Sequence, residues 1–325
     1  MESITKNRQS LDTLRAMVTR AYGKDQVPSR TGKWVHELGH GWFNVAYRVR
    51  LRDGRDVVLK IAPPPGVDVM TYERGAMATE LAAIELIRES TAVPVPAVDF
   101  VDTTGELGGA DWFFMPYVDA DNYGVIRSTL SAREQDKLDQ ALGLATRELN
   151  AIRGDRFGPL IGPGSPSWRT QFLTMFETVL ADGSRKGVDL DYPALRALAE
   201  SQAGCLDEVT EPRLVEWDLW DSNVLVRDGR IVCIIDHERA FYGDPLIEAG
   251  FVATQLRSFG DPTAFLRGYG KLTLTPAEHD RRRLYTLHLT LIMLIETAYR
   301  GVTGPRHLDW VRARLTEALA LFDRP

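Results

Sequence analysis

Three oxygen-bearing side chains flank a short stretch with the pattern of a β-hairpin. Asp218 and Asn223 precede the apolar segment 224–226, and Asp236 follows the apolar segment 231–235. Because a hairpin returns the chain to the end where it began, Asn223 and Asp236 are expected to lie side by side. Carboxylate and amide oxygens suit Mg²⁺, a hard cation that takes one or two protein ligands besides water and phosphate. Asp218 would then lie where it could accept a proton from an attacking hydroxyl.

Each of these residues, taken singly, is also typical of a cap or a turn, so the hypothesis depends on the joint pattern. A second charged residue that needs a partner is Lys60, which stands inside the apolar strand pattern 57–61. An ammonium group among aliphatic side chains is costly unless it meets an opposite charge. Glu80 is the expected partner and Glu73 a second candidate, while a lysine that reaches solvent from an edge strand is the alternative.

Gly39-His40-Gly41 lies before a predicted strand, where bare glycine backbone could approach an anion and offer N–H groups. An ordinary turn is the alternative interpretation. Several other phosphate and hydrolase motifs are missing from the sequence. It contains no G-x-x-x-x-G-K-[ST], no third glycine of a dinucleotide fingerprint, no G-x-S-x-G and no H-E-x-x-H. P-loop enzymes and hydrolases of those types are therefore disfavoured.

The elements that must position these residues fall into two groups. The first part of the chain predicts a small α+β lobe, in which a hairpin, a helix and two more strands follow one another. Its expected helices are 10–22 and 72–89, and its expected strands are 45–51, 56–62, 97–102 and 112–118. Beyond residue 119 the apolar period becomes helical, and Ser131 with Glu134 forms a capping box. Helices are expected there at 168–180, 193–209, 262–270, 276–299 and 308–322, besides the one opened by Ser131.

Composition agrees with a two-lobed globular chain of 325 residues, 44% hydrophobic and 26% charged. The expected domains are 1–118, which carries nucleotide-binding candidates, and 119–325, which carries catalytic and acceptor-binding candidates. The net charge is −6, with 14 basic and 15 acidic side chains in 1–118 and 25 and 30 in 119–325. This sign disfavours a nucleic-acid partner and is weakly compatible with a cationic small molecule, although solubility explains it equally well.

The sequence has no long apolar run and few cysteines, and both features bear on where the protein is located and on its redox chemistry. No apolar run is long enough to span a membrane, and the N-terminal residues do not read as a signal peptide. Two cysteines, Cys205 and Cys233, support neither a disulfide framework nor a four-cysteine zinc site. We therefore expect a cytoplasmic protein with no membrane partner, and the sequence leaves its oligomeric state open.

Taken together, these residues resemble the aminoglycoside phosphotransferase family of small-molecule kinases, which share the protein-kinase fold. The resemblance spans roughly residues 33–300 and is most specific over 214–248. It implies an α+β protein-kinase-like fold with two lobes. The small N-terminal lobe would be an antiparallel sheet plus a helix, and the larger C-terminal lobe would be mainly helical.

The resemblance also implies roles and cofactors. ATP and Mg²⁺ would be the cofactors, with Asp218 as catalytic base and with Asn223 and Asp236 as Mg²⁺ ligands. Lys60 would hold the α- and β-phosphates and Glu80 would fix Lys60, while Gly39 and Gly41 would lie near the nucleotide. The family's hinge between lobes falls on 115–118. In that hinge Met115, Pro116 and Val118 would lie at the adenine, bonded through the Pro116 carbonyl and the Val118 N–H.

Two positions depart from the family's pattern. Glu216-Trp217 stand where His-Gly usually precedes the catalytic aspartate, and Trp220 replaces a common histidine. Glu238 is a possible neighbour of the metal, and Asp244 before Pro245 reads as a loop cap.

The predicted function is an ATP- and Mg²⁺-dependent phosphotransferase that acts on a hydroxyl of a small molecule, with an aminoglycoside or another antibiotic as candidate acceptor. The alternatives are a kinase of a neutral metabolite or macrolide, and a nucleotide-binding pseudokinase that serves as an interaction module. The sequence does not decide between ATP and GTP. Aromatic candidates for the walls of the acceptor site are Trp168, Phe172, Phe176, Trp220 and Tyr242.

Overall fold

A five-stranded antiparallel sheet is the centre of the first of two units. The strand order is β1-β2-β3-β5-β4, and every neighbouring pair is antiparallel. The strands are β1 (Val35–Glu37), β2 (Val45–Arg50), β3 (Asp56–Ile61), β4 (Phe100–Asp102) and β5 (Trp112–Pro116). The computed structural model describes residues 3–29, 33–39 and 41–323. It confirms the predicted hairpin and the two later strands, whereas β1 was not predicted because three residues are too few to show an alternation.

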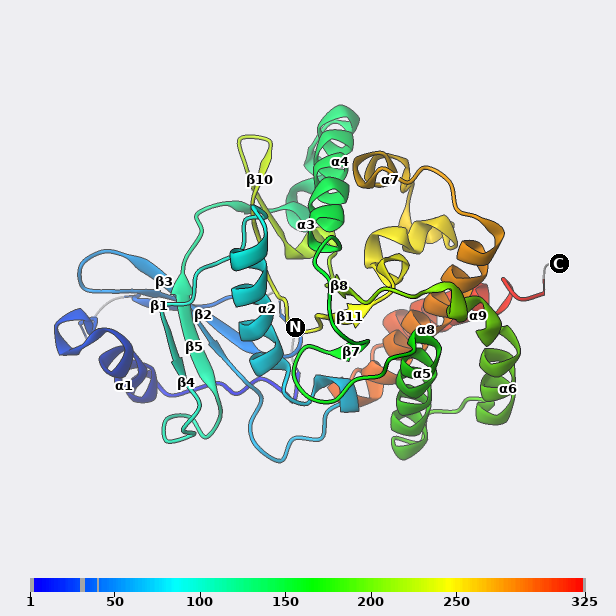
Figure 1. Cartoon of the computed structure of the whole chain (residues 1–325). Helices are drawn as coiled ribbons and strands as arrows, with labels where there is room; N and C mark the ends of the chain where they lie inside the picture. The colour runs from blue at the N-terminus through cyan, green and yellow to red at the C-terminus, as the bar shows by residue number, and fades with distance from the viewer. Residues whose placement is uncertain (1–2, 30–32, 40, 324–325) are drawn as a thin grey trace. The chain divides into compact units, whose positions relative to one another are not determined.

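Helix α1 (Leu11–Tyr22) belongs to the same unit as this sheet (Figure 1). Its N-cap is Ser10, whose side chain accepts a hydrogen bond from the Thr13 N–H. Alternate residues of β2 point into the core, and the buried face of α1 belongs to the same cluster. The core members from these two elements are Leu14, Met17, Val18, Val45, Tyr47 and Val49.

The two compact units are Met1–Val69 with Pro96–Asp119, and Met70–Val95 with Ala120–Pro325. The segment Met70–Val95 therefore groups with the second unit, although the sequence suggested a single boundary near residue 118. The expected helix over 72–89 is shorter than predicted. A 3-10 turn (Thr71–Glu73) comes first, Gly75 adopts a left-handed φ of 75°, and α2 (Ala76–Ser90) begins only after it. Glu73 therefore does not share a helix with Glu80.

The second unit is mainly helical and is built around α8 (Pro276–Arg300). A capping box of Thr275 and Glu278 starts this helix, Pro276 occupies its first turn, and Gly301 ends it in the left-handed conformation. Leucines and isoleucines of α8 are buried along its length, so the helix forms the core of the unit. The other helices are α3 (Tyr123–Ile126), α4 (Ala132–Leu149), α5 (Trp168–Arg185), α6 (Tyr192–Gln202), α7 (Thr263–Tyr269) and α9 (Pro305–Leu319).

Two small sheets in this unit carry the candidate site. The first has the order β10-β9-β6 and the second the order β7-β11-β8. Their strands are β6 (Asp121–Asn122), β7 (Gly158–Pro159), β8 (Arg213–Val215), β9 (Val224–Arg227), β10 (Arg230–Ile234) and β11 (Phe241–Gly243). In the β9–β10 hairpin Val224 lies opposite Ile234, as the predicted hairpin requires. Among the described residues, none of the helices combines the length and the apolar character of a membrane-spanning segment.

Candidate active site

The backbone between β8 and β9 is held in an unusual conformation directly before Asp218. Trp217 has a φ of 62°, which is rare for a bulky side chain and costs on the order of 1–3 kcal/mol. Two hydrogen bonds and one ring stack maintain this conformation. The buried Glu248 carboxylate accepts hydrogen bonds from the N–H groups of Glu216 (3.0 Å) and Trp217 (2.9 Å), and the Trp217 ring stacks on His288 at 5.5 Å and 10°. The segment that presents Asp218 is thus fixed by interactions within the second unit.

Asp218 lies in a polar but largely buried environment. The Trp220 indole Nε1 donates a hydrogen bond to Asp218 Oδ1 at 2.8 Å, and Arg239 Nε lies 3.6 Å from Asp218 Oδ2. Burial, together with the nearby charges of Asp236 and Glu296, raises the pKa of Asp218 to about 6, while Arg239 and the Trp220 hydrogen bond act in the opposite direction. The side chain remains 23% exposed, so a small molecule could reach this carboxylate.

Asn223 and Asp236 are brought to one end of the β9–β10 hairpin, as the sequence predicted. The Ile235 N–H donates to the Asn223 carbonyl at 3.0 Å, which closes the hairpin between them. The Asn223 side-chain amide donates to the Asp218 carbonyl oxygen at 2.8 Å, which ties the amide to the Asp218 segment. Asp236 also adopts the left-handed conformation, with a φ of 71°, as Trp217 does in the loop that carries Asp218.

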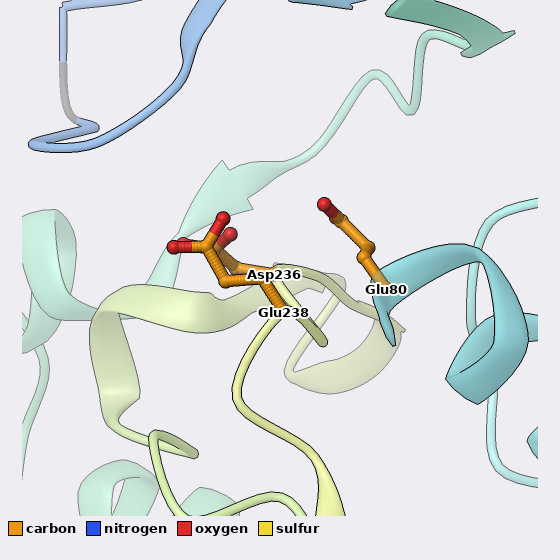
Figure 2. Close-up of side chains that lie close together, drawn as sticks. All are labelled: Glu80, Asp236 and Glu238. Atoms are coloured by element: carbon orange, nitrogen blue, oxygen red, sulfur yellow. The ribbon is translucent and has the colours of Figure 1, made fainter. Parts of the chain in front are cut away.

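A cluster of three carboxylates lies at this end of the hairpin. Glu80 from α2, Asp236 and Glu238 each offer an oxygen, and these oxygens lie within 4.8 Å of one another (Figure 2). An all-oxygen donor set of this kind suits Mg²⁺. The residues present therefore fit the metal that the sequence implied. Glu238, whose role the sequence left open, belongs to this cluster.

A buried ion pair joins the two loops that carry Asp218 and Asp236. His237 Nδ1 lies 2.7 Å from Glu216 Oε2, and His237 Nε2 lies 3.0 Å from the carbonyl oxygen of Ile234. Both ring nitrogens face acceptors, so the ring donates from both in its protonated form. Burial alone would lower the pKa of His237, but the Glu216 carboxylate outweighs it and the pKa is raised. Glu216 stands where the family's pattern has a histidine. Through its ion pair with His237, it connects the two loops of the site.

A chain of alternating charges extends from Asp218 toward α8. Arg239 contacts Glu296 at 3.2 Å, and Glu296 contacts Arg300 at 2.8 Å. Arg300 in turn pairs with Glu73, whose carboxylate also accepts the Met70 N–H. Glu73, the second candidate partner of Lys60, thus has Arg300 as an ion-pair partner, and its pairing with Lys60 stays a prediction. Sequence reasoning missed the pairing of Arg239 with Glu296, because the two residues lie 57 positions apart in the chain.

The remaining predicted residues belong to the first unit, apart from Glu80. Lys60 lies within β3, opposite Ala46 and Phe113, and only 7% of its surface is exposed. Lys60 and Glu80 fall in different units, so their pairing stays a prediction. Gly39 and Gly41 lie in the connection between β1 and β2, and His40 is outside the described residues.

The residues of the expected hinge also lie in the first unit. Met115 and Pro116 end β5, where Met115 lies opposite Val58, and Val118 follows that strand. Their roles toward a nucleotide stay predictions. Asp244 is the N-cap of a short 3-10 turn and accepts a hydrogen bond from the Leu246 N–H, which agrees with its expected role as a loop cap.

Comparison with solved structures identifies the fold. A ternary complex of a thermostable variant of aminoglycoside phosphotransferase APH(4)-Ia with AMP-PNP and hygromycin B is similar with a TM-score of 0.69 and 18% identity, over 96% of this chain and 99% of that one. The streptomycin–ATP complex of APH(2")-IIa is similar with a TM-score of 0.60 and 15% identity, over 95% and 97%. The chain therefore has the protein-kinase-like fold of these enzymes, as expected.

Sequence comparisons add the family. A subtelomeric hrmA-associated cluster protein of Aspergillus fumigatus is 24% identical over 153 residues, which is 47% of this chain and 29% of that protein. The chain thus matches less than a third of the length of this curated relative. Residues 34–285 match the phosphotransferase enzyme family, and that stretch contains every predicted site residue. The chain belongs to the phosphotransferase enzyme family.

Proposed function

We propose that the protein transfers the γ-phosphate of ATP to a hydroxyl group of a small molecule, in a reaction that requires Mg²⁺. The observation that carries this proposal is the convergence of Asp218, Asn223 and Asp236 at one end of the β9–β10 hairpin. Family membership supports a phosphotransferase, and the similar solved structures hold ATP or its analogue AMP-PNP. We place the reaction in the cytoplasm on the sequence alone.

The chemistry needs positioning and charge stabilisation rather than covalent catalysis, because the transition state of phosphoryl transfer is loose and strongly charged. Mg²⁺ would be held by Asn223 and Asp236, with Glu238 and Glu80 close by, and when bound it neutralises phosphate charge. Asp218 accepts the hydroxyl proton, and Lys60 and the 115–118 segment bind the nucleotide. Candidate acceptors are an aminoglycoside or another antibiotic, and a neutral metabolite or macrolide.

The test begins with the base. Asp218→Asn keeps the size of the side chain and a hydrogen-bond acceptor for Trp220 but cannot take a proton, so turnover should fall about 10²–10⁴-fold. Phosphate transfer from radiolabelled ATP across an acceptor panel measures the effect, and the melting temperature checks folding. Wild-type turnover by this variant would contradict the proposed role.

If the protein is a pseudokinase, the same experiment should give a different result. It would gain thermal stability with ATP, with or without Mg²⁺, yet phosphorylate none of the acceptors. The departure at Glu216-Trp217 is the feature that would favour this alternative. The His237–Glu216 pair and the Glu248 hydrogen bonds keep the loop ordered despite that departure, which supports the enzyme.

A further inference from the structure

An aromatic strip leads away from Asp218 along the surface of the second unit. Trp220, whose indole N–H is bonded to Asp218 Oδ1, stacks on Phe259 with ring centroids 5.7 Å apart and planes at 26°. Phe259 meets Trp310 of α9 edge-to-face at 6.1 Å, and Trp310 stacks on His307 at 6.2 Å. Trp220, Phe259 and Trp310 are defined here as the aromatic strip.

The strip starts where an acceptor must lie. A hydroxyl that gives its proton to Asp218 has to come within about 3 Å of that carboxylate. Since Trp220 is hydrogen-bonded to one oxygen of the same carboxylate, the acceptor lies beside the indole. Trp310, at the outer end, is 41% exposed, a large value for a tryptophan in a folded protein.

Several carboxylates near the strip have arginine partners. Asp221 lies 3.7 Å from Arg127, and Glu317 lies 2.6 Å from Arg314. The Arg314 guanidinium also lies over the Trp310 ring, 5.5 Å from its centroid. Asp218 and Glu296 both face Arg239, at 3.6 and 3.2 Å. A polycationic acceptor would have to displace these arginines, whereas an uncharged ring would not.

Three of the other aromatic residues considered as acceptor walls do not offer such a surface. Trp168, Phe172 and Phe176 are buried, with at most 2% exposure, and they pack against Tyr285 and His288 of α8. They are core residues. Among those candidates Trp220 alone is in contact with the Asp218 carboxylate within the described parts of the chain.

We propose that the aromatic strip Trp220–Phe259–Trp310 is the acceptor-binding surface and that the acceptor is an uncharged pyranoside, which lays the apolar C–H face of its sugar ring on the strip next to the phosphorylated hydroxyl. This inference rests on the proposed function and narrows its substrate class. Tryptophan and phenylalanine faces attract the C–H face of a sugar or another aromatic ring, and such ring pairs add binding beyond area burial.

The test uses the full chain and two probes, p-nitrophenyl β-D-glucopyranoside and the polycation gentamicin. Trp310→Ala removes the outer ring of the strip at an exposed position, so the fold should survive. The matched control is Leu272→Ala, which removes an even more exposed apolar side chain (63%) elsewhere in the same unit. A second variant, Phe259→Leu, removes the ring between the two tryptophans.

We expect phosphorylation of the glucoside in preference to gentamicin. Trp310→Ala should raise the KM for the glucoside roughly threefold to tenfold and leave kcat and the KM for ATP within about twofold. Phe259→Leu should act in the same direction, and Leu272→Ala should change nothing. Preferred turnover of gentamicin, unaffected by Trp310→Ala, would overturn the aromatic strip as acceptor site but leave the phosphotransferase proposal intact.

Binding measured without turnover separates the two proposals. If neither probe is phosphorylated, saturation-transfer NMR of the glucoside with the wild type, Trp310→Ala and Leu272→Ala decides the inference. A saturation-transfer signal that weakens only in Trp310→Ala supports the strip as a ring-binding surface, even when the proposed reaction fails. No signal with the wild type, or equal signals with all three proteins, refutes it.

Discussion

At the scale of single residues, Arg239 and Asp218 are the pair on which the proposed chemistry depends. Arg239 places a positive charge beside the Asp218 carboxylate, and it is itself held by Glu296. Its guanidinium also lies over the ring of Tyr72, 5.2 Å from the centroid. An arginine fixed from three directions can orient a carboxylate rather than merely neutralise it.

We predict that Arg239→Gln lowers kcat roughly tenfold or more, because a hydrogen bond or ion pair to a charged group is worth about 1.5–3 kcal/mol. Arg239→Lys should recover part of the loss, since it keeps the charge but not the planar geometry. The effect should fall on kcat more than on the KM for ATP. Steady-state kinetics measure both parameters.

The control for this prediction is Arg196→Gln, which removes an exposed arginine paired with Glu177 in the same unit. Exposed pairs contribute about 0–1 kcal/mol, so activity should not change. Equal kinetics for Arg239→Gln and Arg196→Gln would show that Arg239 does not position Asp218.

A further prediction concerns Lys60, which lies in the first unit. The backbone of Lys60 pairs with Ala46 of β2 and Phe113 of β5, and Lys60→Ala keeps this pairing, so the variant should still fold. Loss of an ammonium that binds phosphate should lower kcat/KM for ATP about tenfold to a hundredfold. Nucleotide-dependent thermal shifts and kinetics measure this loss. Unfolding of the variant at ordinary temperature would instead identify Lys60 as a residue required for the fold.

At the scale of elements, α4 and α7 approach so closely that two positions exclude a side chain. A Cβ at Gly143 of α4 would lie 2.1 Å from the Phe265 carbonyl oxygen, and one at Gly268 of α7 would lie 1.8 Å from the Gln140 carbonyl oxygen. Neither distance can be relieved by a rotamer change, because both partners are backbone atoms. The two helices must separate to accept any side chain at this crossing.

We therefore predict that Gly143→Ala destabilises the protein by about 1–3 kcal/mol, although alanine favours a helix by about 1 kcal/mol over glycine. Urea unfolding measures the change. Gly204→Ala is the matched control, because a Cβ there would meet nothing within 4 Å. A Gly143→Ala variant as stable as Gly204→Ala would mean that α4 and α7 can separate at no cost.

At the scale of the whole molecule, buried ionisable groups link stability to pH in both directions. Burial lowers the pKa of His288 to about 4, so this ring is neutral in the folded protein. As the pH falls below about 6.5, the unfolded chain binds a proton that the folded chain does not, and stability is lost until about pH 4. His237 and Glu248 act in the opposite sense, because the pKa values of both are raised, that of Glu248 to about 7.

We predict that His288→Phe retains the stack on Trp217 and removes this part of the acid sensitivity. Between pH 7.5 and pH 4.5 the variant should lose less unfolding free energy than the wild type, by up to about 3 kcal/mol. Denaturant unfolding at the two pH values measures the difference. His36→Gln changes an exposed histidine of β1 and should leave the pH dependence unchanged, and parallel pH curves for wild type and His288→Phe would contradict the prediction.

The sequence by itself determined most of the longer elements and part of the site. Alternation of apolar residues located β2, because a half-buried strand repeats every two residues, and short apolar runs bounded by turns located β3, β5 and the β9–β10 hairpin. A hairpin returns the chain to its starting end, so Asn223 and Asp236 could be paired from their spacing alone. Family membership and fold agree with the resemblance carried by those residues.

Only the tertiary structure decided which distant side chains meet. Glu248 binds the backbone before Asp218, His237 pairs with Glu216, and Arg239 pairs with Glu296. Phe259 and Trp310 join Trp220 in one strip from three separate segments. None of these interactions has a fixed sequence separation, because they depend on how helices pack, and packing is set by the shape of many side chains together rather than by local periodicity.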